Sequence, residues 1–224
     1  MTKVYLSGSE SINNEIKEFL SGKAEFTQNP EEAGIIFNTT NYPEYEKSEE
    51  LQYIESVTPD TIPIFTSSLC VSVSEQCRLQ AHPARLIGIG LYDTFSKAKR
   101  IEIAPSKITD AAILKNAENF LSEAGVNYSV VPDRVGLIFP RIVSMIINEA
   151  AQVYSEQIAS KEDIDTAMKL GTNYPFGPLE WADRLGVELV YNILAALQRD
   201  FGEDRYRPHP LLKEMANLKK RFYD

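Results

Sequence analysis

One segment, from Asp163 to Leu185, constrains the fold more than any other part of the chain. It reads DIDTAMKLGTNYPFGPLEWADRL and places two prolines and two glycines between two amphipathic stretches. Ser160 with Asp163 forms a capping-box-like start for the first stretch, and Gly171 is a favourable residue for its end. Pro178 suits the first position of the next helix, because a residue there can spare its N–H. The segment therefore predicts a helix, an ordered loop and a second helix.

Composition narrows the class of protein. The chain has 224 residues, 43% of them hydrophobic, which allows one large domain or two ordinary ones with a sizeable core. A formal net charge of −9 and a pI near 4.9 disfavour nucleic acids and acidic lipid surfaces as partners. No apolar run approaches the ~20 residues of a membrane helix, and no basic region followed by an apolar one opens the chain. Cys70 and Cys77 show no spacing typical of a metal site or an activated thiol. We expect a globular cytoplasmic protein with reduced cysteines, no metal, and no nucleic-acid or membrane partner.

The organisation of the chain changes near Pro132. Before it, short β-type runs alternate with helical periodicity, which is typical of βαβ units. The expected strands are 3–7, 24–27, 34–38, 62–66, 86–91, 100–103 and 126–131, and the expected helices are 12–20, 72–80 and 109–123. After Pro132 the apolar spacing is helical, first at positions 138, 142, 145, 146, 150 and 153, then from Ser160, from Pro178 and over 187–201. We predict an α/β domain over 1–132 and an all-α domain over 133–224.

The helical part resembles the 3-hydroxyacyl-CoA dehydrogenase family, in which an ED-ID-AM-LG-G-YP-GP-E-AD--G pattern recurs. The matching residues are Glu162, Asp163, Ile164, Asp165, Ala167, Met168, Leu170, Gly171, Tyr174, Pro175, Gly177, Pro178, Glu180, Ala182, Asp183 and Gly186. Asn148 and Glu149 match an NEA stretch, and 206–210 matches a run near the end. The resemblance covers about 62–210 well and the first sixty residues poorly. It implies a truncated Rossmann-like parallel sheet, of the kind that carries NAD, followed by a helical dimerisation domain like the C-terminal domain of 6-phosphogluconate dehydrogenase.

The expected cofactor turn departs from the family. A dinucleotide turn needs glycines after the first strand, so that the backbone can approach the pyrophosphate at a helix N-terminus. Residues 7–11 read SGSES, which retains Gly8 and places Glu10 where a diphosphate would lie. The second strand ends without an Asp or Glu for the ribose, and the helix that the family places after it is deleted. We expect no bound cofactor, since NAD is implied by family resemblance alone.

The resemblance also locates the family's catalytic positions. The family uses a His–Glu pair to remove the hydroxyl proton, with a Ser and an Asn that contact the substrate oxygen. The His position falls on Gly90, the Ser position on Leu69 and the Asn position on Pro140, which offers no N–H. Glu102 retains the Glu position as a remnant. Three of these four positions therefore lack the group that the reaction needs.

Other residues remain open as site candidates. A small shift of the alignment puts Ser67 or Ser68 at the Ser position, and Asp93, Tyr92 or Glu102 could replace the lost base. Glu102 has a structural alternative, as a strand carboxylate paired with a basic residue such as Lys99. His82 and His209 adjoin prolines and fit turns better than catalysis.

Two functions follow from these observations. Loss of the base alone costs about 10²–10⁴-fold in rate, so we interpret the chain as a family member without the NAD-dependent reaction. It would act as a homodimeric binding or assembly module, built through its helical domain, with an acyl-CoA as candidate ligand. The alternative is an active NAD-dependent oxidoreductase of fatty acid metabolism, acting on a 3-hydroxyacyl-CoA-like substrate with altered catalytic residues.

Overall fold

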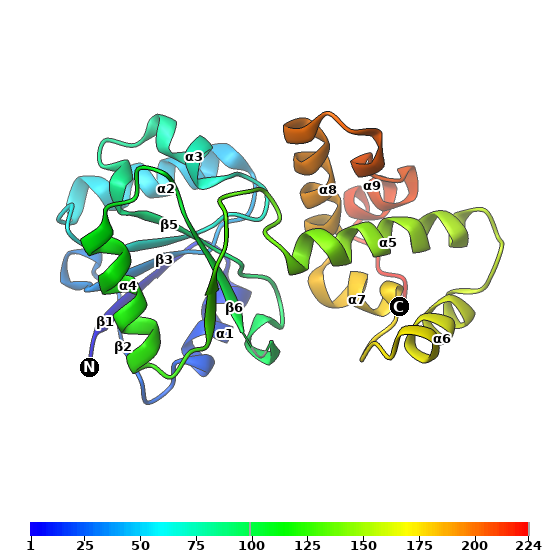
Figure 1. Cartoon of the computed structure of the whole chain (residues 1–224), viewed down its shortest axis with the longest axis horizontal. Helices are drawn as coiled ribbons and strands as arrows, with labels where there is room; N and C mark the ends of the chain where they lie inside the picture. The colour runs from blue at the N-terminus through cyan, green and yellow to red at the C-terminus, as the bar shows by residue number, and fades with distance from the viewer. Residues whose placement is uncertain (99, 224) are drawn as a thin grey trace. The chain divides into compact units, whose positions relative to one another are not determined.

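A computed structural model describes residues 1–98 and 100–223 (Figure 1). Lys99, the suggested partner of Glu102, lies outside the described residues. The chain forms two compact units, Met1–Leu137 and Ile138–Asp224. Residues 133–137, which the sequence analysis placed with the helices, join the first unit. Their anchor is Asp133, whose carboxylate accepts hydrogen bonds from the N–H groups of Val73 and Ser74, both at 2.8 Å.

The first unit is built on a seven-stranded sheet of order β2-β1-β3-β4-β5-β6-β7. The strands are β1 (Lys3–Ser7), β2 (Glu25–Thr27), β3 (Ile35–Asn38), β4 (Ile64–Ser67), β5 (Leu86–Ile89), β6 (Ile101–Pro105) and β7 (Tyr128–Val130). β6 runs antiparallel to β5, whereas the other neighbours pair in parallel. The expected α/β class is confirmed. Between β2 and β3 there is only a short 3₁₀ turn, Pro30–Glu32, in place of a helix.

Helices cover both faces of this sheet (Figure 1). On one face, α1 (Glu10–Phe19) and α4 (Ala111–Glu123) bury apolar side chains against Phe37 and Phe65, whose rings stack at 4.9 Å. On the other face, α2 (Glu44–Val57) and α3 (Val73–Gln76) pack on Ile36 and Ile64. Since successive side chains of a strand point to opposite faces, the continuous apolar run of β3 serves both cores.

Helix α2 was not predicted from the sequence. Its buried residues are Lys47, Leu51, Ile54 and Glu55, so two of the four inward positions carry charge. A search for apolar residues at helical spacing finds too few of them here. The two charged side chains point inward because each has polar partners below the helix.

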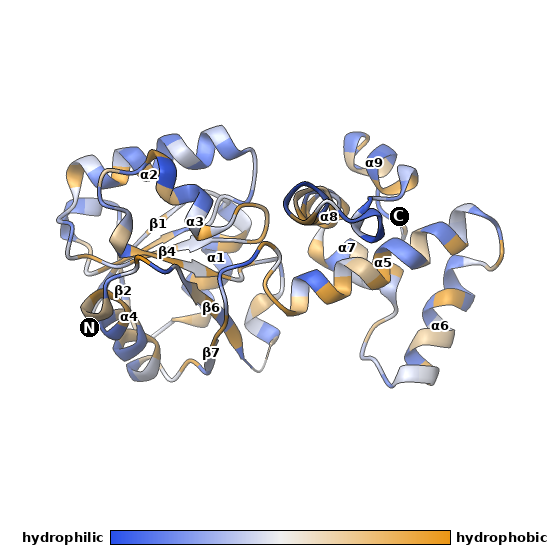
Figure 2. Ribbon diagram, turned by 45° about the horizontal axis from the view of Figure 1, so that its top comes forward, coloured by the Kyte–Doolittle hydropathy of each residue, from blue (hydrophilic) through white to orange (hydrophobic). Residues whose placement is uncertain are grey.

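The second unit is all-helical, as expected. Its helices are α5 (Phe139–Ser155), α6 (Lys161–Thr172), α7 (Pro178–Leu185), α8 (Val187–Phe201) and α9 (Pro210–Asn217). Hydrophobic and hydrophilic residues alternate along α5 (Figure 2). Val143, Ile147 and Ala151 are buried, whereas Ile138 and Ile142 are 49% and 54% exposed. The apolar stripe that predicted α5 is therefore partly surface. Among the described residues, no helix combines the length and apolarity needed to span a membrane.

The predicted end of α6 at Gly171 is wrong. The helix continues through Thr172 and ends at Asn173, whose φ of 56° is left-handed. Asn tolerates this conformation because its short polar side chain bonds locally. The start is as expected, since the Ser160 side chain accepts a hydrogen bond from the Asp163 N–H at 3.1 Å.

Candidate functional site

The carboxyl ends of β1 and β3 form the place where a ligand is expected. The parallel strands have the order 2-1-3-4-5, and ligands of such sheets bind outside the carboxyl ends, where the order reverses. β3 ends at Asn38 and is followed by Thr39 and Thr40, and all three residues are buried. The Thr39 hydroxyl lies 2.7 Å from the Ser7 carbonyl oxygen and 2.8 Å from Asn13 Oδ1. This edge is thus bound together by the chain's own polar groups.

A buried amine completes this network. Lys47, 2% exposed, donates to Asn38 Oδ1 at 2.8 Å and to the Thr40 carbonyl oxygen at 2.9 Å. Glu50 accepts from Asn38 Nδ2 at 2.5 Å and from Thr40 Oγ1 at 2.7 Å. Burial lowers the pKa of Lys47 to about 7, with Glu50 opposing the shift. The amine therefore serves as an internal cross-link between α2 and β3.

The turn after β1 does not fit NAD. A G-x-G-x-x-G spacing that starts at Gly8 puts Glu10 and Asn13 at the second and third glycine positions. The second glycine allows backbone to approach the pyrophosphate, and the third allows close packing of helix on strand. Here Glu10 adds a carboxylate to the first turn of α1, and Asn13 fills the packing position through its contact with Thr39. Gly8 itself has a φ of 94° and lies against Thr40, so its own position still requires glycine.

Gly90 and Glu102 lie together where β5 meets β6. The Gly90 N–H donates to the Glu102 carbonyl oxygen at 3.0 Å. A Cβ atom at Gly90 would stand 3.1 Å from Leu137 Cδ1, which is tighter than ordinary packing. The end of the Leu137 side chain would therefore have to shift by a few tenths of an ångström to admit a side chain at Gly90. The two positions are brought together as the family pattern implies, but one holds no base.

Tyr92 interacts electrostatically with Glu102. Burial raises its pKa to about 12, and the charges of Glu102 and Glu15 add to the shift. A phenol with this pKa stays protonated at neutral pH and makes a poor general base. Asp93, another candidate, points to α1, where Ser11 Oγ donates to its Oδ1 at 2.7 Å.

The serine candidates lie at the end of β4. Ser67 Oγ donates to Asn41 Oδ1 at 2.5 Å, and Asn41 Nδ2 donates to the Leu91 carbonyl oxygen at 3.3 Å. Ser68 and Leu69 are fully buried. Ser67 thus belongs to a bridge between the ends of β4 and β5, whereas Leu69 is a core residue.

Pro140 belongs to the second unit, in the first turn of α5, where its side chain is buried. A proline at this position stabilises a helix start, because no N–H is needed there. It offers neither a donor nor a proton-transfer group.

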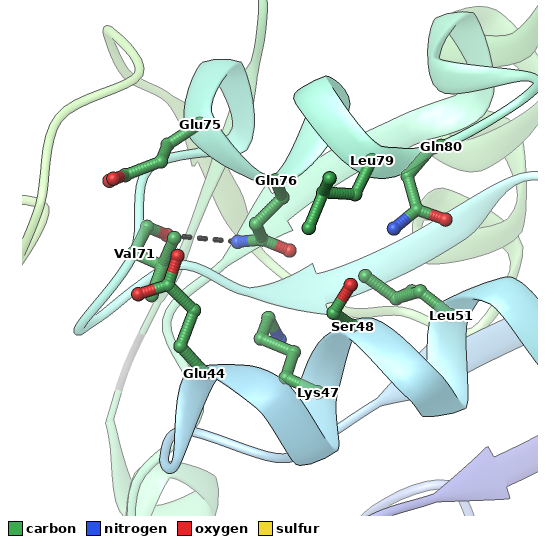
Figure 3. Close-up of a pocket in the computed structure, with 9 residues that line it drawn as sticks. All are labelled: Glu44, Lys47, Ser48, Leu51, Val71, Glu75, Gln76, Leu79 and Gln80. Atoms are coloured by element: carbon green, nitrogen blue, oxygen red, sulfur yellow. Dashed lines mark hydrogen bonds between the residues drawn. The ribbon is translucent and has the colours of Figure 1, made fainter.

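A small cavity lies between α2 and α3 (Figure 3). It is lined by Glu44, Lys47, Ser48, Leu51, Val71, Glu75, Gln76, Leu79 and Gln80. Gln76 closes its floor, with Nε2 donating to the Val71 carbonyl oxygen at 2.8 Å. The cavity holds ≈ 20 Å³, room for about one water molecule, so it is far too small for a nucleotide.

The cysteines show no sign of chemistry. Cys70 and Cys77 are not joined in a disulfide. Burial raises the pKa of the Cys77 thiol to about 11, so little reactive thiolate forms at neutral pH. No group of three or more His, Cys, Asp or Glu side chains within the described residues could hold a metal ion.

The chain is similar in sequence to known proteins of one family. Residues 136–221 match the domain described as 3-hydroxyacyl-CoA dehydrogenase, C-terminal domain. The 3-hydroxybutyryl-CoA dehydrogenase of Clostridioides difficile is 34% identical over 161 residues, 70% of this chain and 56% of that protein. The 3-hydroxyadipyl-CoA dehydrogenase of Escherichia coli K12 is 40% identical over 120 residues, 54% of this chain and 25% of that protein.

The chain belongs to the 3-hydroxyacyl-CoA dehydrogenase family. The crystal structure of FadB2 from M. tuberculosis shares the fold, with a TM-score of 0.82 at 19% identity over 98% of this chain and 89% of that one. The chain spans about a quarter to just over half of the length of the two curated relatives named above.

In the helical unit, residues of the family motif make hydrogen bonds that stabilise the fold. Asp165, 1% exposed, accepts hydrogen bonds from the N–H groups of Leu179 at 2.8 Å and Glu180 at 3.0 Å. It thereby holds the N-terminus of α7. Glu180 in turn accepts from the Gly177 N–H at 2.9 Å, and Asp183 accepts from the N–H groups of 222 and 223. In this 3-hydroxyacyl-CoA dehydrogenase family member, these motif residues fix a loop and the chain end.

The polar network around Asn38, Thr40 and Lys47 in the first unit was not predicted from the sequence. Asn38, Thr39, Thr40 and Asn41 form a polar run directly after a buried strand, which was the available signal. Lys47 and Glu50 gave no signal, because their helix was itself missed. Of the proposed site residues, the structure brings Gly90 and Glu102 together, and it places Gly8, Asp93, Ser67 and Ser68 in other contacts.

Proposed function

We propose that this chain is a 3-hydroxyacyl-CoA dehydrogenase-like protein that binds an acyl-CoA thioester without carrying out the NAD-dependent reaction. The observation that carries the proposal is Gly90. The base position has no side chain, and Leu137 Cδ1 would stand 3.1 Å from a Cβ atom placed there. Without a base near the hydroxyl, about 10²–10⁴-fold of the rate is lost. The turn after β1, with Glu10 in the phosphate position, supports the same proposal.

A second candidate is an active NAD-dependent oxidoreductase of fatty acid metabolism with altered catalytic residues. The comparisons favour it, because the relatives that match this chain are named as dehydrogenases of 3-hydroxyacyl-CoA substrates. Glu102 would then be the residue to act as base, since it lies beside Gly90. Tyr92, with a pKa raised to about 12, is less suited to the role.

The proposal includes a cytoplasmic homodimer formed through the helical unit. Its support is the apolar surface of α5, where Ile142 is 54% exposed and Phe139 is 37% exposed. Exposed apolar side chains that follow one helix are a common feature of protein–protein interfaces.

Calorimetric titration with acetoacetyl-CoA, with and without NADH, tests the proposal. We expect the thioester to bind at micromolar to sub-millimolar concentration, with no change of affinity when NADH is present. Absence of thioester binding would contradict the binding role. Consumption of NADH in the same cell would instead establish the second candidate, and Glu102→Gln would then have to abolish it.

A further inference from the structure

The N-terminal half of α1 is tied to a segment that comes 82 residues later. Ser11 Oγ donates to Asp93 Oδ1 at 2.7 Å. One turn further along α1, the carboxylate of Glu15 accepts from the N–H groups of Thr94 at 2.8 Å and Ser96 at 2.9 Å, and from the Ser96 hydroxyl. We call residues 93–96 the strap.

The strap is also packed into the core. Phe95, 2% exposed, lies with its ring 5.6 Å from that of Phe19 at the far end of α1, in an edge-to-face arrangement. Thr94 has a φ of 75°, and this left-handed conformation has an energetic cost for a residue other than glycine. The hydrogen bond from the Thr94 N–H to Glu15 offsets that cost. Polar bonds and a buried ring thus attach the same four residues to one helix.

The other side of the same helix is tied to the sheet. The Thr39 hydroxyl lies within hydrogen-bond distance of Asn13 Oδ1, at 2.8 Å, and of the Ser7 carbonyl oxygen, at 2.7 Å. The side chains of Ser11, Asn13 and Glu15, all in the first turns of α1, therefore each contact another part of the chain. In a dinucleotide-binding fold this is the helix whose N-terminus receives the pyrophosphate.

Negatively charged side chains lie at the start of α1. A helix N-terminus attracts an anion through its dipole and its spare N–H groups. Glu10 lies in the first turn of α1, and Asp93 accepts a hydrogen bond from Ser11 in the same turn. Two carboxylates of the chain therefore lie in or beside this first turn, and their negative charge disfavours a further anion there.

We propose that the strap anchors α1 through Ser11 and Glu15 in place of a bound pyridine nucleotide, and that the carboxylates of Glu10 and Asp93 disfavour the pyrophosphate of NAD at the start of this helix. This inference concerns the nucleotide edge alone and does not depend on whether the base at Gly90 is lost. It accounts for the misfit of the turn, because the polar side chains at the start of α1 are engaged in contacts within the chain.

Two readouts on the whole protein test the strap. In hydrogen–deuterium exchange, we expect the amides of Thr94 and Ser96 to be protected and to exchange at least about 10-fold faster in Glu15→Ala. Glu18→Ala, an exposed carboxylate on the same helix, is the matched control and should leave them unchanged. Equal exchange in both variants, or no protection in the wild type, would overturn the proposed anchor.

The second readout is NADH fluorescence. We expect no saturable enhancement up to about 1 mM NADH with the wild type. Binding below about 100 µM would overturn this inference, even if acetoacetyl-CoA were not turned over. Conversely, turnover of acetoacetyl-CoA with a different reductant would contradict the proposed function and leave the strap standing. The two failures are therefore distinguishable.

Discussion

The helical unit retains the residues of the family motif, whereas the sheet unit departs from the family pattern at the positions assigned to the chemistry. In the helical unit the motif is retained, and Asp165, Gly177 and Glu180 each make a contact that shapes the loop before α7. In the sheet unit the positions that the family resemblance assigns to the chemistry hold Gly90 and Glu10, while the seven-stranded sheet around them is formed. The residues that shape the fold and the residues that the family resemblance assigns to the reaction therefore lie at separate positions, and one set can be present without the other.

The largest effect on stability is expected from a substitution at Gly177. A Cβ atom there would collide with the Asp165 side chain, although the backbone φ of −73° suits any residue. We expect Gly177→Ala to lower the free energy of unfolding by about 3 kcal/mol, through overpacking and disturbed hydrogen bonds at Asp165. Urea unfolding measures this.

Gly171→Ala is the matched control. Gly171 is helical, and nothing lies within 4 Å of its Cβ position. The substitution should raise stability by about 0.5–1 kcal/mol, because alanine favours a helix over glycine. If both glycine variants behaved alike, the contact between Gly177 and Asp165 would not be what preserves the motif.

The sheet unit is tested by placing the family's His and Asn side chains at Gly90 and Pro140. We expect Gly90→His combined with Pro140→Asn to show no NADH-dependent reduction of acetoacetyl-CoA, because Glu10 and the strap remain. The histidine should also cost about 1–3 kcal/mol of stability against Leu137. Measurable turnover by the double variant would show that the nucleotide edge still works.

Lys47 tests the polar network by pH. Its pKa is lowered to about 7 in the folded state, below the ordinary value of 10.5, so the unfolded chain binds more protons between these values. Stability should therefore rise with pH from about 7 towards 10. We expect the unfolding free energy of the wild type to gain about 1–2 kcal/mol over Lys47→Met between pH 7 and pH 9. Parallel pH profiles for the two proteins would refute an amine that deprotonates in this range.

The smallest effect on stability is expected at the surface of α5. Ile142→Asp should change the unfolding free energy by less than about 0.5 kcal/mol yet shift a dimer to monomer in analytical ultracentrifugation. Leu170→Asp, at an 81% exposed position on α6, is the control that should leave the dimer intact. A monomeric wild type would refute the proposed homodimer.

Much of the fold could be predicted because its signals are local. The apolar runs of β1, β3 and β5 and the caps at Ser160 and Pro178 each lie within a few residues. α2 could not be predicted, since Lys47 and Glu55 replace apolar residues at buried positions. The end of α6 was misplaced because Asn173 takes the left-handed turn and Gly171 does not.

The candidate site was predictable only in part. Family spacing identified Gly90 and Glu102, which are indeed neighbours across two strands. The bonds of Asp93 to Ser11 and of Glu15 to the strap join residues about 80 positions apart, and no local pattern announces them. Such contacts depend on how β5 and α1 pack, which the sequence pattern does not specify.

The most direct measurement is the absorbance of NADH at 340 nm with acetoacetyl-CoA and the purified wild-type protein, beside the Clostridioides difficile 3-hydroxybutyryl-CoA dehydrogenase as a positive control. We expect no decrease above the protein-free rate while the control consumes NADH. A protein-dependent decrease that Glu102→Gln abolishes would contradict the account, because it would show that the sheet unit has kept its reaction along with its fold.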